Sequence, residues 1–320
     1  MQPLQGILVV DFTRYLPGAY TSRELLRLGA RIVRVEEPEG DPLRQTAPSW
    51  HDVLREGTES VVCDLKSDPA VARALCARAD VVLESFRPGV AARLGIGPDD
   101  VSSSAVFCSI TGFGEGTRHE ARAGHDLNYL GWAGTLADTA PCLPPIQVAD
   151  LAAGGLTAVV RILAALLDRE RSGLGARVVV SMTHSTHDLI SYRTNGDPRP
   201  RLLTGGLACY RTYATGDGRR LTVAALEPKF FARLCELLER PDLAERQYDD
   251  DQEALADELA AVFTLRSLDA WLEHFDGEDV CVGPVSTIDE AVAEFGSAAA
   301  PRGVALGAHT ELWRRELGVA

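Results

Sequence analysis

Short runs of β-branched and apolar residues alternate with helix-like segments through the first half of this 320-residue chain. The strand-like runs lie at 7–12, 30–35, 60–65, 81–84 and 105–110. Parallel strands need a crossover connection, which is usually a helix, so this alternation predicts a parallel sheet covered by helices. The right-handedness of such crossovers favours an open, doubly wound sheet, and we therefore predict an α/β fold with a Rossmann-like domain.

The pattern changes near residue 190. Turn-forming residues fill 195–200, and two strand-like pieces at 210–214 and 221–225 are joined by Thr-Gly-Asp-Gly, which is typical of a β-hairpin. Helix-like segments follow at 229–238, 252–263 and 268–275. We predict a large Rossmann-like domain, a smaller α+β domain and a C-terminal segment that returns to the large domain, at 1–190, 191–290 and 291–320.

Composition excludes several classes of protein. The chain carries 32 Lys and Arg against 46 Asp and Glu, a formal charge of −14, so we expect no broad binding of nucleic acid or of an anionic membrane surface. Its seven cysteines form no C-x-x-C pair, which indicates a reducing cytoplasm and no disulfide framework. No signal-peptide pattern opens the sequence. The apolar stretch 151–167 is shorter than the about 20 residues of a membrane span, and we expect a buried helix there.

Common cofactor motifs are missing from the positions where they would act. The first predicted strand continues into Thr-Arg-Tyr-Leu-Pro-Gly instead of G-x-G-x-x-G, and no Walker sequence occurs, so NAD, FAD and nucleotide-triphosphate sites are not expected. His184 and His187 have a spacing that suits a metal, but no third ligand is recognisable. We therefore predict no metal site.

The segment Gly124-His125-Asp126-Leu127-Asn128-Tyr129 carries the most direct chemical signal. An imidazole titrates near neutral pH, so His125 is a candidate general base. Free N–H groups at a helix start can also stabilise an oxyanion. The residues alone leave a structural alternative open, in which His125 lies in a loop and Asp126 caps the following helix.

Two further carboxylates precede predicted helices. Asp150 stands directly before the apolar stretch, where an N-cap contributes about 1 kcal/mol. If apolar neighbours partly shield the same carboxyl from water, its pKa is raised and it can transfer protons. Glu227 follows a strand and precedes Pro228, as a helix-start carboxylate or as a group that orients His125.

Beyond these signals, the chain resembles the family III CoA-transferase superfamily over nearly its whole length, and within it the alpha-methylacyl-CoA racemases. The matching motifs lie at 61–66, 84–90, 109–114, 124–129, 149–150, 204–206, 225–228 and 282–285. Each motif is modest on its own, whereas their order and spacing together are specific. The resemblance implies a Rossmann-like large domain and a small domain in an interlocked homodimer.

The resemblance also implies roles for particular residues. His125 and Asp150 match a pair that exchanges the proton on the carbon α to a thioester, and Glu227 matches a glutamate that supports the histidine. We expect the two groups to act on opposite faces of that carbon, with N–H groups around Asp126 on the thioester oxygen. Segments that contact CoA would contribute Arg34, Cys63, Asp64, Leu65, Lys66, Arg87, Gly124, Leu127, Asn128 and Tyr129.

These implications leave no role for a metal or redox cofactor, because coenzyme A enters as part of the substrate, an acyl-CoA thioester.

Two basic positions of the family are altered. Glu36-Glu37-Pro38 replaces a frequent Asp-Arg-Pro, and the run from Gly57 to Ser60 replaces a basic Gly-Lys-Arg-Ser. Other arginines, such as Arg14 or Arg44, would then bind the phosphates, or the acyl carrier presents only a phosphopantetheine arm.

Two alternative functions stay open. In a CoA-transferase, Asp150 would form the covalent acyl intermediate. In the second alternative, the chain is a non-catalytic subunit that has the fold but does not catalyse the reaction. The altered basic positions support that alternative. The presence of His125 favours the racemase.

Overall fold

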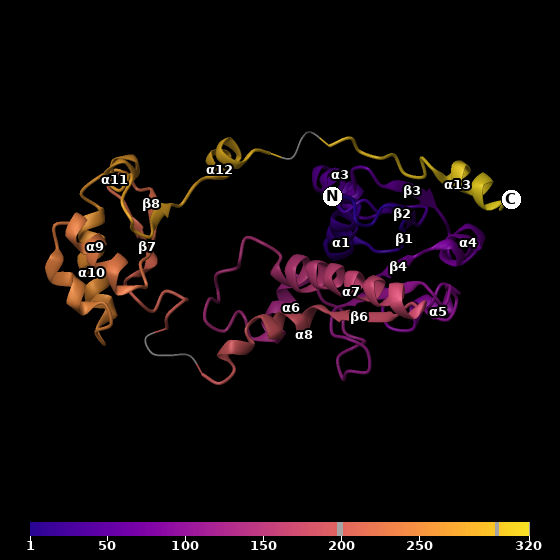
Figure 1. Cartoon of the computed structure of the whole chain (residues 1–320), viewed down its shortest axis with the longest axis horizontal. Coiled ribbons are helices and arrows are strands. Elements are labelled where there is room, and N and C mark those ends of the chain that lie inside the picture. The colour runs from indigo at the N-terminus through magenta and orange to yellow at the C-terminus, as the bar shows by residue number, and fades with distance from the viewer. Residues whose placement is uncertain (197–200, 298–300, 320) are drawn as a thin grey trace. The chain divides into compact units, whose positions relative to one another are not determined.

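A computed structural model describes residues 1–196, 201–297 and 301–319. The chain forms two compact units (Figure 1). One comprises Met1–Tyr192 with Ala298–Ala320, and the other comprises Arg193–Ser297. The last helix of the chain, α13 (Thr310–Leu317), therefore belongs to the larger unit, where it packs against α4 (Ala70–Arg78) and buries Trp313.

A six-stranded parallel sheet forms the centre of the larger unit, in the order β3-β2-β1-β4-β5-β6. The strands are β1 (Leu8–Asp11), β2 (Arg31–Glu36), β3 (Glu59–Val62), β4 (Val81–Glu84), β5 (Val106–Thr111) and β6 (Arg177–Ser181). This order confirms the predicted Rossmann-like α/β fold. The strand order reverses between β1 and β4, and open sheets of this kind bind ligands outside the carboxyl ends of the strands at such a reversal. The sequence prediction missed β6, which is an edge strand.

Helices cover both faces of this sheet. Val9 faces one apolar core and Val10 the other, because successive strand residues point to opposite faces. The remaining helices of this unit are α1 (Tyr15–Arg27), α2 (Leu43–Thr46), α3 (Pro48–Arg55), α5 (Val90–Arg93), α6 (Asp126–Ala133), the π-helix η1 (Ala149–Leu156), α7 (Thr157–Ser172), α8 (Met182–Leu189) and a 3-10 turn, η2 (Ser191–Arg193).

The predicted buried helix at 151–167 needs correction. η1 and α7 form one continuous helix, Ala149–Ser172, and only one of its faces is buried. Ile162 and Leu166 pack into the core, whereas Leu156, Val160 and Leu167 are exposed. By length and composition this helix could cross a membrane, a test that the core helices of soluble proteins also pass. The sequence prediction ended it too early because the apolar run stops at Leu167, where the polar residues from Asp168 to Ser172 begin.

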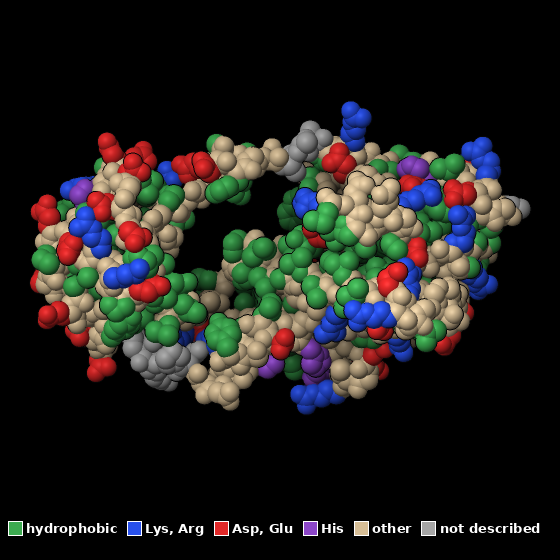
Figure 2. Space-filling view, in the orientation of Figure 1, with side chains coloured by type: hydrophobic (Ala, Val, Ile, Leu, Met, Phe, Trp, Pro, Cys, Tyr) green, Lys and Arg blue, Asp and Glu red, His purple; other side chains and the backbone are tan. Residues whose placement is uncertain are grey.

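The smaller unit is an α+β structure with its own core. The predicted hairpin is present as β7 (Tyr210–Ala214) and β8 (Arg220–Ala224), and β9 (Val282–Pro284) pairs with β8 to complete an antiparallel sheet. The helices are α9 (Pro228–Leu237), η3 (Pro241–Arg246), α10 (Gln252–Phe263), α11 (Leu268–His274) and α12 (Ile288–Phe295). Acidic side chains are spread over the surface of this unit (Figure 2).

Candidate active site

A cavity of about 320 Å³ lies where β4 and β5 end in the larger unit. Its walls come from the start of α1, the loops after β4 and β5, the start of α6 and the first turn of η1. Both His125 and Asp150 line it, so the fold brings these two predicted groups to one cavity. Residues that follow β1 and residues that follow β4 both line it, so it also borders the strand-order reversal described above.

His125 occupies the N-cap of α6 in an extended backbone conformation. Its backbone N–H donates to Asn128 Oδ1 at 3.1 Å, so Asn128 closes the first turn of the helix. The buried Tyr129 supports the same turn, because its hydroxyl donates to the Gly124 carbonyl at 2.5 Å. The imidazole is exposed to the cavity, and Leu127 is exposed as well. The cap fixes the backbone and leaves the side chain of His125 available for chemistry.

Asp150 lies in the first turn of η1 and is 8% exposed. Burial raises its pKa to about 7, and the negative charge of Asp126 contributes to the rise. A carboxyl with this pKa exists in both protonation states near neutral pH, which suits a group that gives and takes protons. The predicted N-cap is wrong, since Val148 holds the cap position and Asp150 is helical.

Asp126 connects the two segments that carry these groups. Its Oδ1 accepts the backbone N–H of Asp150 at 2.9 Å, and it also accepts a backbone hydrogen bond from Ala149. The alternative in which Asp126 caps the following helix is therefore wrong, because Asp126 caps the start of η1 instead. This contact ties the first turn of α6 to the first turn of η1, and so fixes the elements that present His125 and Asp150.

The close approach of α1 to η1 depends on glycine. A Cβ on Gly155 would lie 3.2 Å from the Pro17 carbonyl oxygen and 3.0 Å from the ring of Tyr20. The Thr21 hydroxyl spans the same contact, at 3.3 Å from the Gly155 carbonyl. This packing holds α1, which lines the cavity with Tyr15 and Pro17, against η1, which lines it with Asp150.

Arginines supply the positive charge of the cavity. Arg14, Arg87 and Arg122 line it. Arg14 forms an ion pair with Glu37. Within the described part of the chain, no carboxylate lies at ion-pair distance from Arg87 or Arg122. These two guanidinium groups are the candidates for an anionic part of a ligand, and Arg122 also lies over the ring of Trp132, 5.2 Å from its centroid.

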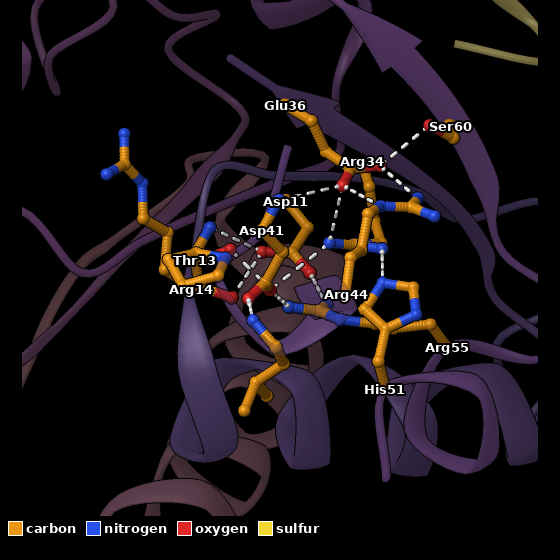
Figure 3. A network of polar contacts seen from close by, with 12 residues as sticks. Asp11, Thr13, Arg14, Arg34, Glu36, Asp41, Arg44, His51, Arg55 and Ser60 are labelled. Atoms are coloured by element: carbon orange, nitrogen blue, oxygen red, sulfur yellow. Dashed lines mark hydrogen bonds and ion pairs between the residues drawn. The ribbon is translucent and has the colours of Figure 1, made fainter. Parts of the chain in front are cut away.

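Arg34, by contrast, belongs to a buried network of ions at the ends of β1 and β2 (Figure 3). Its Nη2 lies 3.2 Å from Glu36 and 3.3 Å from Asp41, and its Nη1 lies 3.1 Å from His51 Nε2. Arg44 is also engaged, since Nη2 contacts Glu36 at 2.7 Å. The expectation that Arg34 or Arg44 binds a phosphate needs correction, because neither guanidinium is free in this arrangement.

Two other predicted CoA contacts lie at a small pocket of about 20 Å³, which Arg34, Glu36 and Asp41 of the network also line. Cys63 and Leu65 line it and are buried. The Asp64 carboxylate accepts the backbone N–H of Lys66 at 2.9 Å and so shapes the turn, while the Lys66 side chain is exposed. Of these residues, Lys66 is the one that carries a positive charge, and it is exposed to solvent.

The altered basic segment from Gly57 to Ser60 has a structural role in this chain. Glu59 accepts hydrogen bonds from Arg31 Nε at 2.7 Å and from Trp313 Nε1 at 2.6 Å. Ser60 donates to Glu36 at 2.7 Å. The bond from Trp313 attaches α13 to the edge strand β3, and the other two bonds join β3 to β2.

Glu227 lies at the N-cap of α9 in the smaller unit and is exposed. It belongs to a different unit from His125, and its expected role beside the histidine stays a prediction. Within the described residues, no three His, Cys, Asp or Glu side chains are grouped as metal ligands.

Sequence reasoning missed several residues that line the cavity, among them Tyr15, Glu120 and Arg122. The Tyr15 ring lies edge-on to the His125 ring, with 5.9 Å between centroids and 89° between planes. Arg122 lies two residues before the Gly124 motif, where a basic residue was a usable signal. No sequence signal pointed to Tyr15, because its position depends on a backbone conformation that cannot be predicted from the sequence.

Comparison with known proteins agrees with this geometry. Residues 4–304 match the family described as CoA-transferase family III. The human protein named alpha-methylacyl-CoA racemase is 36% identical over 311 residues, covering 90% of this chain and 79% of the relative. Mouse succinyl-CoA:glutarate CoA-transferase is 28% identical over 327 residues, covering 92% and 74%.

Solved structures match as well. A hypothetical protein of Mycobacterium tuberculosis superposes with a TM-score of 0.82 at 27% identity, covering 98% of this chain and 99% of that one. A CAIB/BAIF family protein of Brucella suis gives a TM-score of 0.84 at 25% identity, covering 98% and 99%. The relatives thus include both racemases and transferases.

Proposed function

This chain belongs to CoA-transferase family III, and we propose that within the family it is an acyl-CoA racemase or epimerase that acts at the carbon α to the thioester. The observation that carries the proposal is the shared cavity of His125 and Asp150. The identity to racemases, at 34–36%, supports it.

The proposed reaction is a 1,1-proton transfer. One group removes the α-proton, the thioester becomes an enolate, and the other group returns a proton to the opposite face. His125 serves one face and Asp150 the other, and the two exchange roles in the reverse direction. A thioester α-proton is a weak acid, so the enolate oxygen needs electrostatic stabilisation, which we assign to N–H groups at the start of α6.

A CoA-transferase is the alternative, since several relatives carry that name. In that reaction Asp150 would attack as a carboxylate nucleophile. A pKa of about 7 keeps a large fraction of Asp150 protonated at neutral pH, which suits proton exchange better than nucleophilic attack. The raised pKa therefore favours the racemase.

The proposed substrate is an acyl-CoA thioester, in which coenzyme A is a part of the substrate and not a resident cofactor. Arg87 and Arg122 are the groups we assign to its phosphates. We further propose that the protein acts as a homodimer. The exposed apolar residues Leu156, Val160 and Leu167, on one continuous helix, support a protein–protein contact.

The test is deuterium exchange. Each epimer of a 2-methyl-branched acyl-CoA is incubated with the protein in D₂O, without an acceptor acid. A racemase incorporates deuterium at the α-carbon and converts either epimer to a mixture. Transfer of CoA to an added acid, with no label, would identify a transferase instead. Absence of both, with CoA binding in calorimetry, would identify a non-catalytic subunit.

A further inference from the structure

Tyr15, the first residue of α1, has a backbone conformation that its side chain disfavours. Its φ is +61°, and among the described residues Glu239 is the one other non-glycine residue with a positive φ. A bulky residue in this region is an outlier, and it persists where the surrounding structure over-determines it. Such residues cluster at active sites, and Tyr15 lines the cavity that holds His125.

The buried ion network holds the residues that precede Tyr15 (Figure 3). Asp11 Oδ1 accepts the backbone N–H of Thr13 at 2.7 Å and its hydroxyl at 2.6 Å. Arg55, which is ion-paired with Asp11 at 2.5 Å, donates to the Thr13 carbonyl at 3.4 Å. The turn between β1 and α1 is therefore fixed on its buried side.

Arg14 fixes the same turn on its outer side. Its backbone N–H donates to Ser85 Oγ at 3.3 Å, and its guanidinium pairs with Glu37. Gly18 lets α1 begin directly against this turn, since a Cβ there would lie 1.9 Å from Thr13 Oγ1. Contacts thus hold the turn on both sides, and Tyr15 adopts the left-handed conformation directly after it.

This conformation presents the Tyr15 ring to the imidazole of His125 in the edge-on geometry that aromatic rings prefer. Tyr15 is 42% exposed, and its hydroxyl has no hydrogen-bond partner among the described residues. The contact is therefore made by the ring, and the hydroxyl does not take part in it. No other side chain within the described residues makes a ring contact with His125.

We propose that Tyr15 is a positioning residue for His125: its ring holds the imidazole in the cavity, and the ion network supplies the rigid turn that places the ring. The expected effect on proton exchange rests on the proposed function, but the contact between the Tyr15 and His125 rings can be tested without measuring activity.

The experiment compares three variants. Tyr15→Phe keeps the ring and removes the hydroxyl. Tyr15→Gly removes the ring and relieves the backbone strain, so the fold should be no less stable than the wild type. Glu239→Gly, in the smaller unit, relieves the same kind of strain away from the cavity and serves as the matched control.

The first readout is the NMR signal of the His125 Cε1–H, assigned by its loss in His125→Ala. We expect Tyr15→Phe and Glu239→Gly to leave its ring-current shift in place and Tyr15→Gly to remove it. The second readout is deuterium exchange. Misplacement of a catalytic group by about 1 Å can cost 10²-fold, so we expect kcat to fall between 10- and 100-fold in Tyr15→Gly, with a small change in KM.

An unchanged His125 signal together with wild-type exchange in Tyr15→Gly would overturn the inference. If the wild type shows no exchange, the proposed function fails, and the NMR comparison still decides whether Tyr15 positions His125. If Tyr15→Gly does not fold, Tyr15→Asn takes its place, because Asn tolerates the left-handed region.

Discussion

Two clusters of buried charge lie in the larger unit, and they differ in how the charges are compensated. In the network at the ends of β1 and β2, the carboxylates of Asp11, Glu36 and Asp41 each contact at least one arginine. In the cavity at the ends of β4 and β5, the charged neighbour that shifts Asp150 is another carboxylate, Asp126.

The consequence is opposite protonation. Burial alone would raise the pKa of Glu36, but the hydrogen bond from Arg44 and the charge of Arg34 outweigh it and lower that pKa to about 2. Burial also raises the pKa of Asp150, and Asp126 adds to the rise, so it reaches about 7. Both carboxyls are buried, and the arginines decide which one is permanently ionised. The compensated cluster stabilises structure, whereas the uncompensated one can move protons.

Removing a cation from the network should have the largest effect on stability. In Arg55→Met, Asp11 keeps its buried charge without its partner, and the free energy of unfolding should fall by about 3–5 kcal/mol. Urea denaturation measures the loss. Arg14→Met, which breaks a half-exposed pair, is the control. A loss below 1 kcal/mol in Arg55→Met would show that the network does not stabilise the fold.

Removing the groups of the cavity should affect chemistry more than stability. We expect His125→Ala and Asp150→Asn each to slow α-proton exchange by about 10²-fold or more, the scale of a lost general acid or base. Glu227→Ala should slow it less, because its expected role is to orient. Exchange in D₂O measures all three, and wild-type rates in either of the first two variants would remove the two-base mechanism.

The raised pKa of Asp150 should also make the stability of the protein depend on pH. Because the folded-state pKa of Asp150 is raised from 3.8 to about 7, its protonated form stabilises the fold below about pH 4, and this contribution is lost as the pH rises toward 7. Asp150→Asn cannot ionise. The difference in unfolding free energy between Asp150→Asn and the wild type should therefore shift in favour of the variant by up to about 1.4 kcal/mol between pH 5 and pH 6.

The control for this measurement lies within the protein. Burial also raises the pKa of Glu84 to about 7, but Glu84 is present in both proteins, so its effect cancels in the difference. Parallel stability curves for the wild type and Asp150→Asn would contradict the raised pKa.

The smallest effect is expected at the surface. Arg14 and Glu37 form an ion pair whose side chains are 38% and 39% exposed. Exposed pairs contribute less than about 1 kcal/mol, so Glu37→Gln should change the unfolding free energy by less than that. A loss as large as that of Arg55→Met would show that burial is not what separates the strong pairs from the weak ones.

Much of the fold could be predicted because its signals are local. The β-branched runs gave five of the six parallel strands, and Thr-Gly-Asp-Gly gave the hairpin. β6 was missed, although its run of three valines has the same β-branched character, because the run is short and directly follows a long helix and a short turn. The Gly124 motif and Asp150 were identified as candidate site residues, although the sequence could not show that they share a cavity.

By itself, the sequence determined the alternation of strands and helices and the residue types able to exchange a proton, because periodicity and side-chain chemistry belong to the chain. Tertiary structure decided which charges meet. Asp11 and Arg55 are paired across 44 positions and Asp126 holds Asp150 across 24, and neither contact follows from local propensity. The fold thus buried Arg34, strained Tyr15 and left Asp150 without a cation, because burial and pairing depend on which distant segments pack together.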